Sequence, residues 1–73
     1  MKTRVQAQHL ELGDIVGSGE VVSGIVTSST KFPSNKVMVY LDSRDKLTDI
    51  LKYRSVLWGK RTEINVERAN AHL

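Results

Sequence analysis

The sequence contains no cysteine, a single proline, few aromatic residues and no long hydrophobic run. Without cysteine the chain can form no disulfide, and this absence is typical of a reducing compartment. Structural zinc is disfavoured as well, because the only soft ligands, His9 and His72, lie at opposite ends of the sequence. No stretch approaches the roughly 20 apolar residues that a membrane span requires. The charges of residues 1–6 precede no apolar run, so we expect no signal peptide, no membrane association and a cytoplasmic protein.

The length of 73 residues is enough for one domain, and we expect residues 1–73 to form a single domain with loose termini. A chain of about 60 residues buries only about 60% of the surface that its unfolded form exposes, which leaves little stability. Disulfides and metals are not available to this chain, so self-association is the remaining source of support. A homo-oligomer is therefore an open alternative to a monomer.

The net charge of +3 is unevenly distributed along the chain. Residues 1–30 sum to −1, residues 31–61 to +5 and residues 62–73 to −1. This excess in the middle of the chain predicts a positive face on which the cations gather. The alternative interpretation is a solvated surface that only keeps the protein soluble.

The chain is rich in Val, Ile, Thr and Ser, and its glycines and proline interrupt it at short intervals, which is typical of short strands joined by turns. The clearest strand is predicted over residues 36–42. Its inner face would carry Val37, Val39 and Leu41, and its outer face Lys36, Met38, Tyr40 and Asp42.

The other strands are predicted over residues 10–16, 20–29, 47–53 and 62–67. Gly24 indicates a bulge or sharp bend within the second of these. Residues 55–59 are expected to form a single helical turn or an irregular bridge. Five short strands with glycine-marked corners usually close on themselves, because closure removes exposed edges. The sequence therefore predicts an all-β fold, a small five-stranded SH3-like barrel of antiparallel strands.

Part of this pattern resembles the KOW pattern of SH3-like barrels. The matching segments are Gly13-Asp14-Ile15-Val16, Gly19, Gly24-Ile25-Val26 and Lys36-Val37-Met38-Val39, within residues 12–42. The resemblance implies a barrel that binds RNA or protein, as in ribosomal and transcription-associated proteins. The family usually carries lysines in the segment that matches residues 18–23, which here is neutral apart from Glu20. We therefore expect no nucleic-acid contact through that hairpin.

Basic residues interleaved with aromatic residues form the first candidate site. Cations neutralise phosphates, and exposed rings stack on unpaired bases. The predicted nucleic-acid-binding residues are Lys36, Tyr40, Lys52, Tyr53, Arg54, Trp58, Lys60 and Arg61. Trp58 has a core position as its alternative, and Tyr53 can bury its ring while its hydroxyl stays hydrated. Because no recognition helix is predicted, single-stranded nucleic acid or RNA is favoured over sequence-specific reading of a duplex.

A second candidate site consists of apolar side chains on the solvent face of the strand over residues 36–42. Met38 and Tyr40 face outward there, and such a stripe marks a partner site or a dimer seam, unless a neighbouring loop covers it. Phe32 is either a protruding anchor or a plug at one end of the barrel. The alternative function is therefore a protein-interaction module of an accessory or regulatory protein, viral ones included, with anchors at Phe32, Met38 and Tyr40.

Catalytic and metal sites have little support in the sequence. Asp42, Asp45 and Asp49 lack the spacing and the glycine of a calcium loop. Neither histidine has a nucleophile or a carboxylate pair beside it in the sequence. We therefore expect no catalytic residue, no metal and no cofactor, and we do not expect an enzyme.

Overall fold

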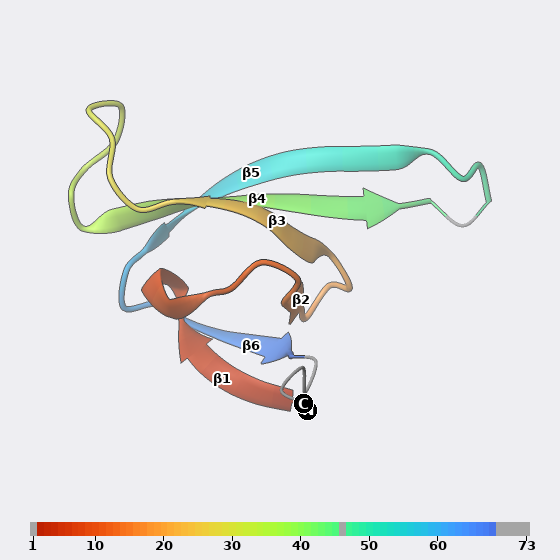
Figure 1. Ribbon diagram of the computed structural model, residues 1–73, viewed down its shortest axis with the longest axis horizontal. Coiled ribbons are helices and arrows are strands. Elements are labelled where there is room, and N and C mark those ends of the chain that lie inside the picture. The colour runs from red at the N-terminus through yellow and green to blue at the C-terminus, as the bar shows by residue number, and fades with distance from the viewer. Residues whose placement is uncertain (1, 46, 69–73) are drawn as a thin grey trace.

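In the computed structural model, which describes residues 2–45 and 47–68, the chain forms an antiparallel sheet of six strands (Figure 1). The strands are β1 (Lys2–Gln6), β2 (Ile15–Val16), β3 (Val21–Val26), β4 (Lys36–Arg44), β5 (Leu51–Gly59) and β6 (Glu63–Glu67). A single 3-10 turn, η1 (Ala7–His9), is the only helical element of the described residues. None of the described helices is long or apolar enough to cross a membrane. The predicted all-β, antiparallel class is confirmed, whereas residues 69–73, where fraying was expected, lie outside the described part.

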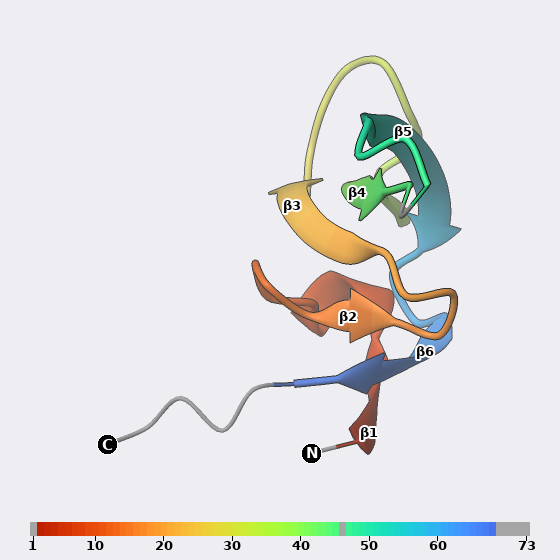
Figure 2. The same ribbon diagram turned by 90° about the vertical axis from the view of Figure 1, so that its right-hand side faces the viewer.

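The strand order is β1-β6-β2-β3-β4-β5, so the predicted closure into a five-stranded barrel is wrong. Within the described residues β1 and β5 are the two edges of the sheet, and no register joins them. The sheet folds over instead, with β3, β4 and β5 above β1, β2 and β6 (Figures 1 and 2). After β5 the chain crosses directly to β6 in the other half, and no strand of residues 2–45 and 47–68 pairs with the outer edge of β5.

β4 is the centre of the hydrophobic core. Val37, Val39 and Leu41 are completely buried, which confirms the alternation predicted for residues 36–42. The core is completed by Ala7, Leu10, Val16, Val22 and Val66. Burial of each aliphatic side chain contributes about 1.5–3 kcal/mol to folding, so the inner row of β4 is a large part of the stability of so small a domain.

A bulge interrupts the pairing of β3 with β4, as the sequence predicts at Gly24. The register shifts between Val22 and Gly24, so that Gly24 lies opposite Tyr40. A Cβ atom on Gly24 would lie only 3.1 Å from Cδ2 of Tyr40. The Tyr40 ring therefore covers the bare backbone of the glycine, in the way that aromatic residues protect glycines in sheets.

Residues 55–59, expected to form a helical turn or an irregular bridge, belong to β5 instead. β4 and β5 pair in unbroken register from Lys36 opposite Gly59 to Arg44 opposite Leu51. This segment is extended because it pairs with β4 in register along its whole length, which outweighs its weak local strand signal.

The N-terminal part of the chain also differs from the prediction. Within the expected strand over residues 10–16, only Ile15–Val16 is paired. Residues 2–6 form β1 instead, which pairs with β6 from Lys2 opposite Glu67 to Gln6 opposite Glu63. The sequence gives little signal for this strand, because its first three residues are exposed and polar.

A buried ion pair ties the residue after β6 to the turn before β2. Asp14 is 2% exposed, and its two carboxylate oxygens accept hydrogen bonds from Nε and Nη2 of Arg68 at 2.9 and 2.7 Å. The backbone N–H of Glu11 donates a third hydrogen bond to Asp14 at 2.9 Å. The Arg68 guanidinium holds the pKa of Asp14 below its usual value, so the carboxylate stays charged within the protein.

The central role of β4 predicts the effect of shortening its side chains. Leu41→Ala is expected to lower the free energy of unfolding by about 2–4 kcal/mol, since it leaves a cavity in the core. Leu47→Ala is the matched control, because Leu47 is 96% exposed and its truncation should change stability by less than about 0.5 kcal/mol. Urea unfolding measures both variants, and equal losses would contradict the assignment of the core.

Candidate functional site

The outer side of β3, β4 and β5 carries an apolar surface. Residues opposite each other in neighbouring strands share a face of the sheet. On the side away from the core, the registers define three rungs, each made of one residue from β3, one from β4 and one from β5. The rungs are Val26, Met38 and Leu57; Gly24, Tyr40 and Ser55; and Val21, Asp42 and Tyr53. Leu51 follows at the end of β5. We call the apolar members the outer face: Val21, Val26, Met38, Tyr40, Leu51, Tyr53 and Leu57.

The outer face is open to solvent. Tyr53 is 73% exposed, and Tyr40 and Leu57 are each 43% exposed. Asp42 is the only charged residue in the three rungs, and its carboxylate accepts a hydrogen bond from the Ser23 hydroxyl at 2.9 Å. A contiguous apolar surface with so little charge is typical of an interaction site.

The residues of the protein-interaction hypothesis are partly brought together. Met38 and Tyr40 lie on neighbouring rungs and point away from the core, so their predicted outward orientation is confirmed. Phe32 lies in the loop between β3 and β4 and is half-buried, outside the three rungs. The sequence gives no signal for the β5 members, Leu51 and Leu57, because their outward orientation follows from the pairing of β5 with β4.

The basic residues of β5 point to the opposite side from Tyr53. Lys52 and Arg54 share the inner side of the strand with Trp58. The Arg54 guanidinium donates hydrogen bonds to both carboxylate oxygens of Glu20, at 2.6 and 2.7 Å, and Nζ of Lys52 lies 4.0 Å from Oδ2 of Asp45. The expectation that the cations of the middle segment gather on one face is therefore wrong.

The aromatic residues of the nucleic-acid hypothesis are divided as well. Trp58 packs against the hydrophobic core, the alternative weighed for it from the sequence. Tyr53 is exposed, but it lies near the start of β5, whereas Lys60 and Arg61 follow its end. The structure therefore does not interleave exposed rings with these cations.

Three cations lie near the other end of the β4–β5 hairpin, and we call Lys36, Lys60 and Arg61 the basic end. Lys36 lies opposite Gly59 in the register, and the Lys60 backbone N–H donates to the Asn35 carbonyl at 2.9 Å. Among the residues that the structure describes, no carboxylate lies within ion-pair distance of these three side chains. A polar hollow of about 670 Å³ adjoins Lys60 and Arg61 and is lined by Gln8, Asn35, Gly59, Lys60, Arg61 and Thr62. Such an arrangement can attract an anion.

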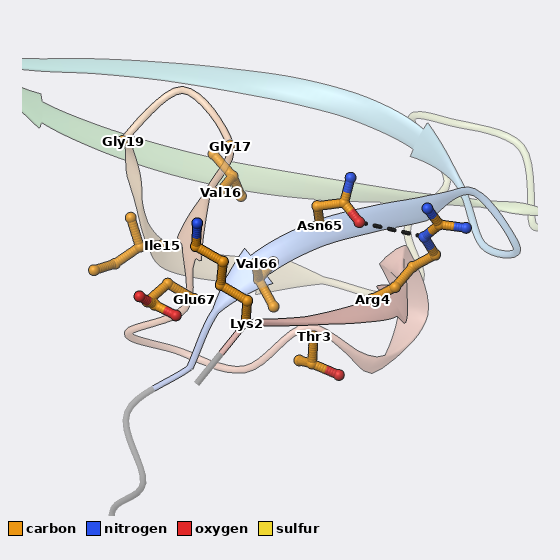
Figure 3. A pocket seen from close by; sticks show the side chains of 10 residues that line it. All are labelled: Lys2, Thr3, Arg4, Ile15, Val16, Gly17, Gly19, Asn65, Val66 and Glu67. Atoms are coloured by element: carbon orange, nitrogen blue, oxygen red, sulfur yellow. Dashed lines mark hydrogen bonds between the residues drawn. The ribbon is translucent and has the colours of Figure 1, made fainter.

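A second hollow of about 670 Å³ lies beside β1, β2 and β6 (Figure 3). Its charged lining residues are Lys2, Arg4 and Glu67, and Arg4 donates hydrogen bonds to Asn65 at 3.2 Å and to Glu63 at 3.3 Å. Among the residues that the structure describes, no histidine or serine lines it.

Metal ligation is not supported by the described part of the chain. Within residues 2–45 and 47–68, no three His, Cys, Asp or Glu side chains are grouped so that they could hold a metal ion. His72, one of the two histidines weighed as a ligand from the sequence, lies outside the described residues.

Comparison of the chain with known protein families, with curated proteins and with solved structures gives no match.

Glu20 is the most strongly perturbed acid of the site region. Hydrogen bonds from the Arg54 guanidinium, and then from the Ser18 hydroxyl, lower the pKa of Glu20 to about 2. The pairing spans 34 residues of sequence, from the turn before β3 to the middle of β5. No signal in the sequence links these two residues. The sequence alone therefore predicts Arg54 as a ligand-binding residue, whereas in the fold it pairs with Glu20.

The lowered pKa of Glu20 predicts an acid-dependent stability. Because the pKa of the folded state lies below that of the unfolded state, the Glu20–Arg54 pair stabilises the fold fully above about pH 4.5 and loses this effect as the pH falls towards about 2. Glu20→Gln should therefore lower the Tm at neutral pH, and its difference from the wild type should shrink and disappear as the pH falls through about 2. Thermal unfolding followed by circular dichroism measures this difference. A constant Tm difference across the pH range would contradict the role of the pair.

Proposed function

We propose that this protein is a non-catalytic protein-interaction module that docks the outer face of β3, β4 and β5 onto a partner protein. The observation that supports this function is the exposure of Tyr40, Tyr53 and Leu57 on one nearly uncharged surface. Tyrosine is enriched at interfaces, because its ring buries a large area at a low cost in side-chain entropy. The absence of cysteine supports a cytoplasmic location for this module.

The charges around the outer face define the chemistry of the partner. Lys36 lies at one end of the face without a carboxylate partner in the described residues, and the whole chain carries a net charge of +3. Arg44, at the other end, is neutralised by Asp49 at 3.0 Å. We therefore expect a partner surface that is apolar in its centre and acidic at its rim.

Selection of peptides from a random library on the immobilised protein tests this function. Peptides that combine aromatic or aliphatic residues with Asp or Glu should be selected, and the double variant Tyr53→Glu/Leu57→Glu should weaken their binding at least about 50-fold, since two apolar anchors are lost. Leu12→Glu is the matched control, because Leu12 is 69% exposed and lies outside the outer face. Peptides that bind the double variant as well as they bind the wild type would rule out the outer face.

Binding of single-stranded nucleic acid through the basic end is a second candidate function. Lys36, Lys60 and Arg61 support it, because no described carboxylate neutralises them. Lys52 and Arg54, which the sequence also predicts as nucleic-acid-binding residues, already form ion pairs with carboxylates of their own chain. The resemblance of residues 12–42 to the KOW pattern of SH3-like barrels is compatible with either an RNA or a protein partner.

The salt dependence of binding tests the second candidate. Three phosphate contacts should give a log–log slope of affinity against salt of about −2 on a labelled single strand. Lys60→Ala/Arg61→Ala should reduce the slope to about −0.7 and leave the thermal unfolding of the domain unchanged. The absence of binding at low salt, or the unfolding of this double variant, would exclude the basic end as a nucleic-acid site.

A further inference from the structure

β5 has an edge along which no described strand pairs. It is the last strand in the order of the sheet, and its register joins it to β4 alone. The part of β5 before Gly59 is eight residues long, and it contains no proline and no bulge. A long regular edge of this kind is a template for pairing with another extended chain.

Two hydrogen bonds at the ends of the hairpin identify the backbone groups on that edge. Asp45 N–H donates to the Ile50 carbonyl at 3.0 Å, and Lys60 N–H donates to the Asn35 carbonyl at 2.9 Å. Both bonds follow the register of β4 with β5. Hydrogen-bonded pairs alternate along an antiparallel ladder. The residues of β5 that bond to β4 are therefore Lys52, Arg54, Val56 and Trp58.

The alternate residues direct their backbone N–H and C=O groups to the open edge. They are Leu51, Tyr53, Ser55 and Leu57, followed by Gly59. The Gly59 carbonyl already accepts a hydrogen bond from Thr62 N–H at 3.0 Å, and η1 lies against this end of β5. The segment available for a further strand is therefore Leu51–Leu57, with Ser55 inside it.

We propose that a second copy of this chain pairs with this edge, β5 to β5, in antiparallel orientation about a two-fold axis at Ser55. Tyr53 then lies directly across from the partner's Leu57, and Leu57 lies across from the partner's Tyr53. Aromatic–aliphatic pairs of this kind stabilise antiparallel strands. The same operation places the two outer faces side by side, so that they form one continuous surface.

The charges of β5 favour this register over the one centred on Arg54. With the axis at Ser55, Arg54 faces the partner's Val56, so no like charges stand opposite each other. With the axis at Arg54, the next register that keeps the edge hydrogen bonds, the two Arg54 side chains would face each other, which is unfavourable. Glu20 and Asp45 of the same chain also offset the charges of Arg54 and Lys52, so the edge is close to neutral.

This inference goes beyond the proposed docking function, because it depends on the backbone edge of β5 and not on the apolar side chains alone. The two can fail separately. A chain that stays monomeric but selects peptides through Tyr53 and Leu57 would overturn only the self-pairing. A dimer whose selected peptides ignore those residues would overturn only the docking function.

Sedimentation equilibrium from micromolar to near-millimolar concentration tests the pairing. The wild type should show a reversible monomer–dimer equilibrium. Ser55→Pro removes an N–H that points to the open edge and should weaken dimerisation at least tenfold, while the bonds to β4 remain and urea unfolding shows a folded domain. Ser55→Thr keeps the N–H and should dimerise as the wild type does. A wild type that is monomeric at every concentration would overturn the proposal, as would a Ser55→Pro variant that dimerises normally.

Disulfide trapping gives a second measurement that does not depend on a proline. Opposed Cα atoms of a hydrogen-bonded antiparallel pair are about 5.5 Å apart, which a disulfide can span. Ser55→Cys should therefore form a covalent dimer under mild oxidation much faster than Ser28→Cys, an exposed control in the loop after β3. Because the chain has no other cysteine, each product has one possible linkage. Equal rates for the two variants would contradict the two-fold axis at Ser55.

Discussion

The burial of Val37, Val39 and Leu41 in the centre of the folded sheet is the constraint on which the rest of the structure depends. Side chains alternate along a strand, so the burial of these three directs Met38 and Tyr40 to solvent. The neighbouring strands are in register with β4 and continue both rows. The same hydrophobic requirement that makes the core thus produces the exposed apolar surface on its other side.

Charged side chains mainly hold distant segments together in this domain. Asp14 and Arg68 join the turn before β2 to the residue after β6, and Glu20 and Arg54 join the turn before β3 to β5. Side-chain burial differs between the two carboxylates, at 2% exposed for Asp14 and 12% for Glu20, and both have lowered pKa values. Arginines placed in this way act as structural cross-links between distant segments.

The open sheet places an apolar face next to a backbone edge of β5 that pairs with no strand of the described residues. A closed barrel would have satisfied that edge. Tyr53 and Leu57 belong to both features, since their side chains lie on the outer face and their backbone groups point to the edge. Pairing through the edge would therefore enlarge the face, and a chain this short gains stability from such a contact.

The sequence by itself determined the all-β class, the buried and exposed rows of β4, and the bulge at Gly24, because these depend on alternation and on glycine within a few neighbouring residues. Only the tertiary structure decided that residues 2–6 and 55–59 are strands, since each is extended by a partner strand and not by its own composition. The structural role of Arg54 also depends on the tertiary structure. Its bond to Glu20 crosses 34 residues of chain, and a contact between positions so far apart exists only once the sheet has folded.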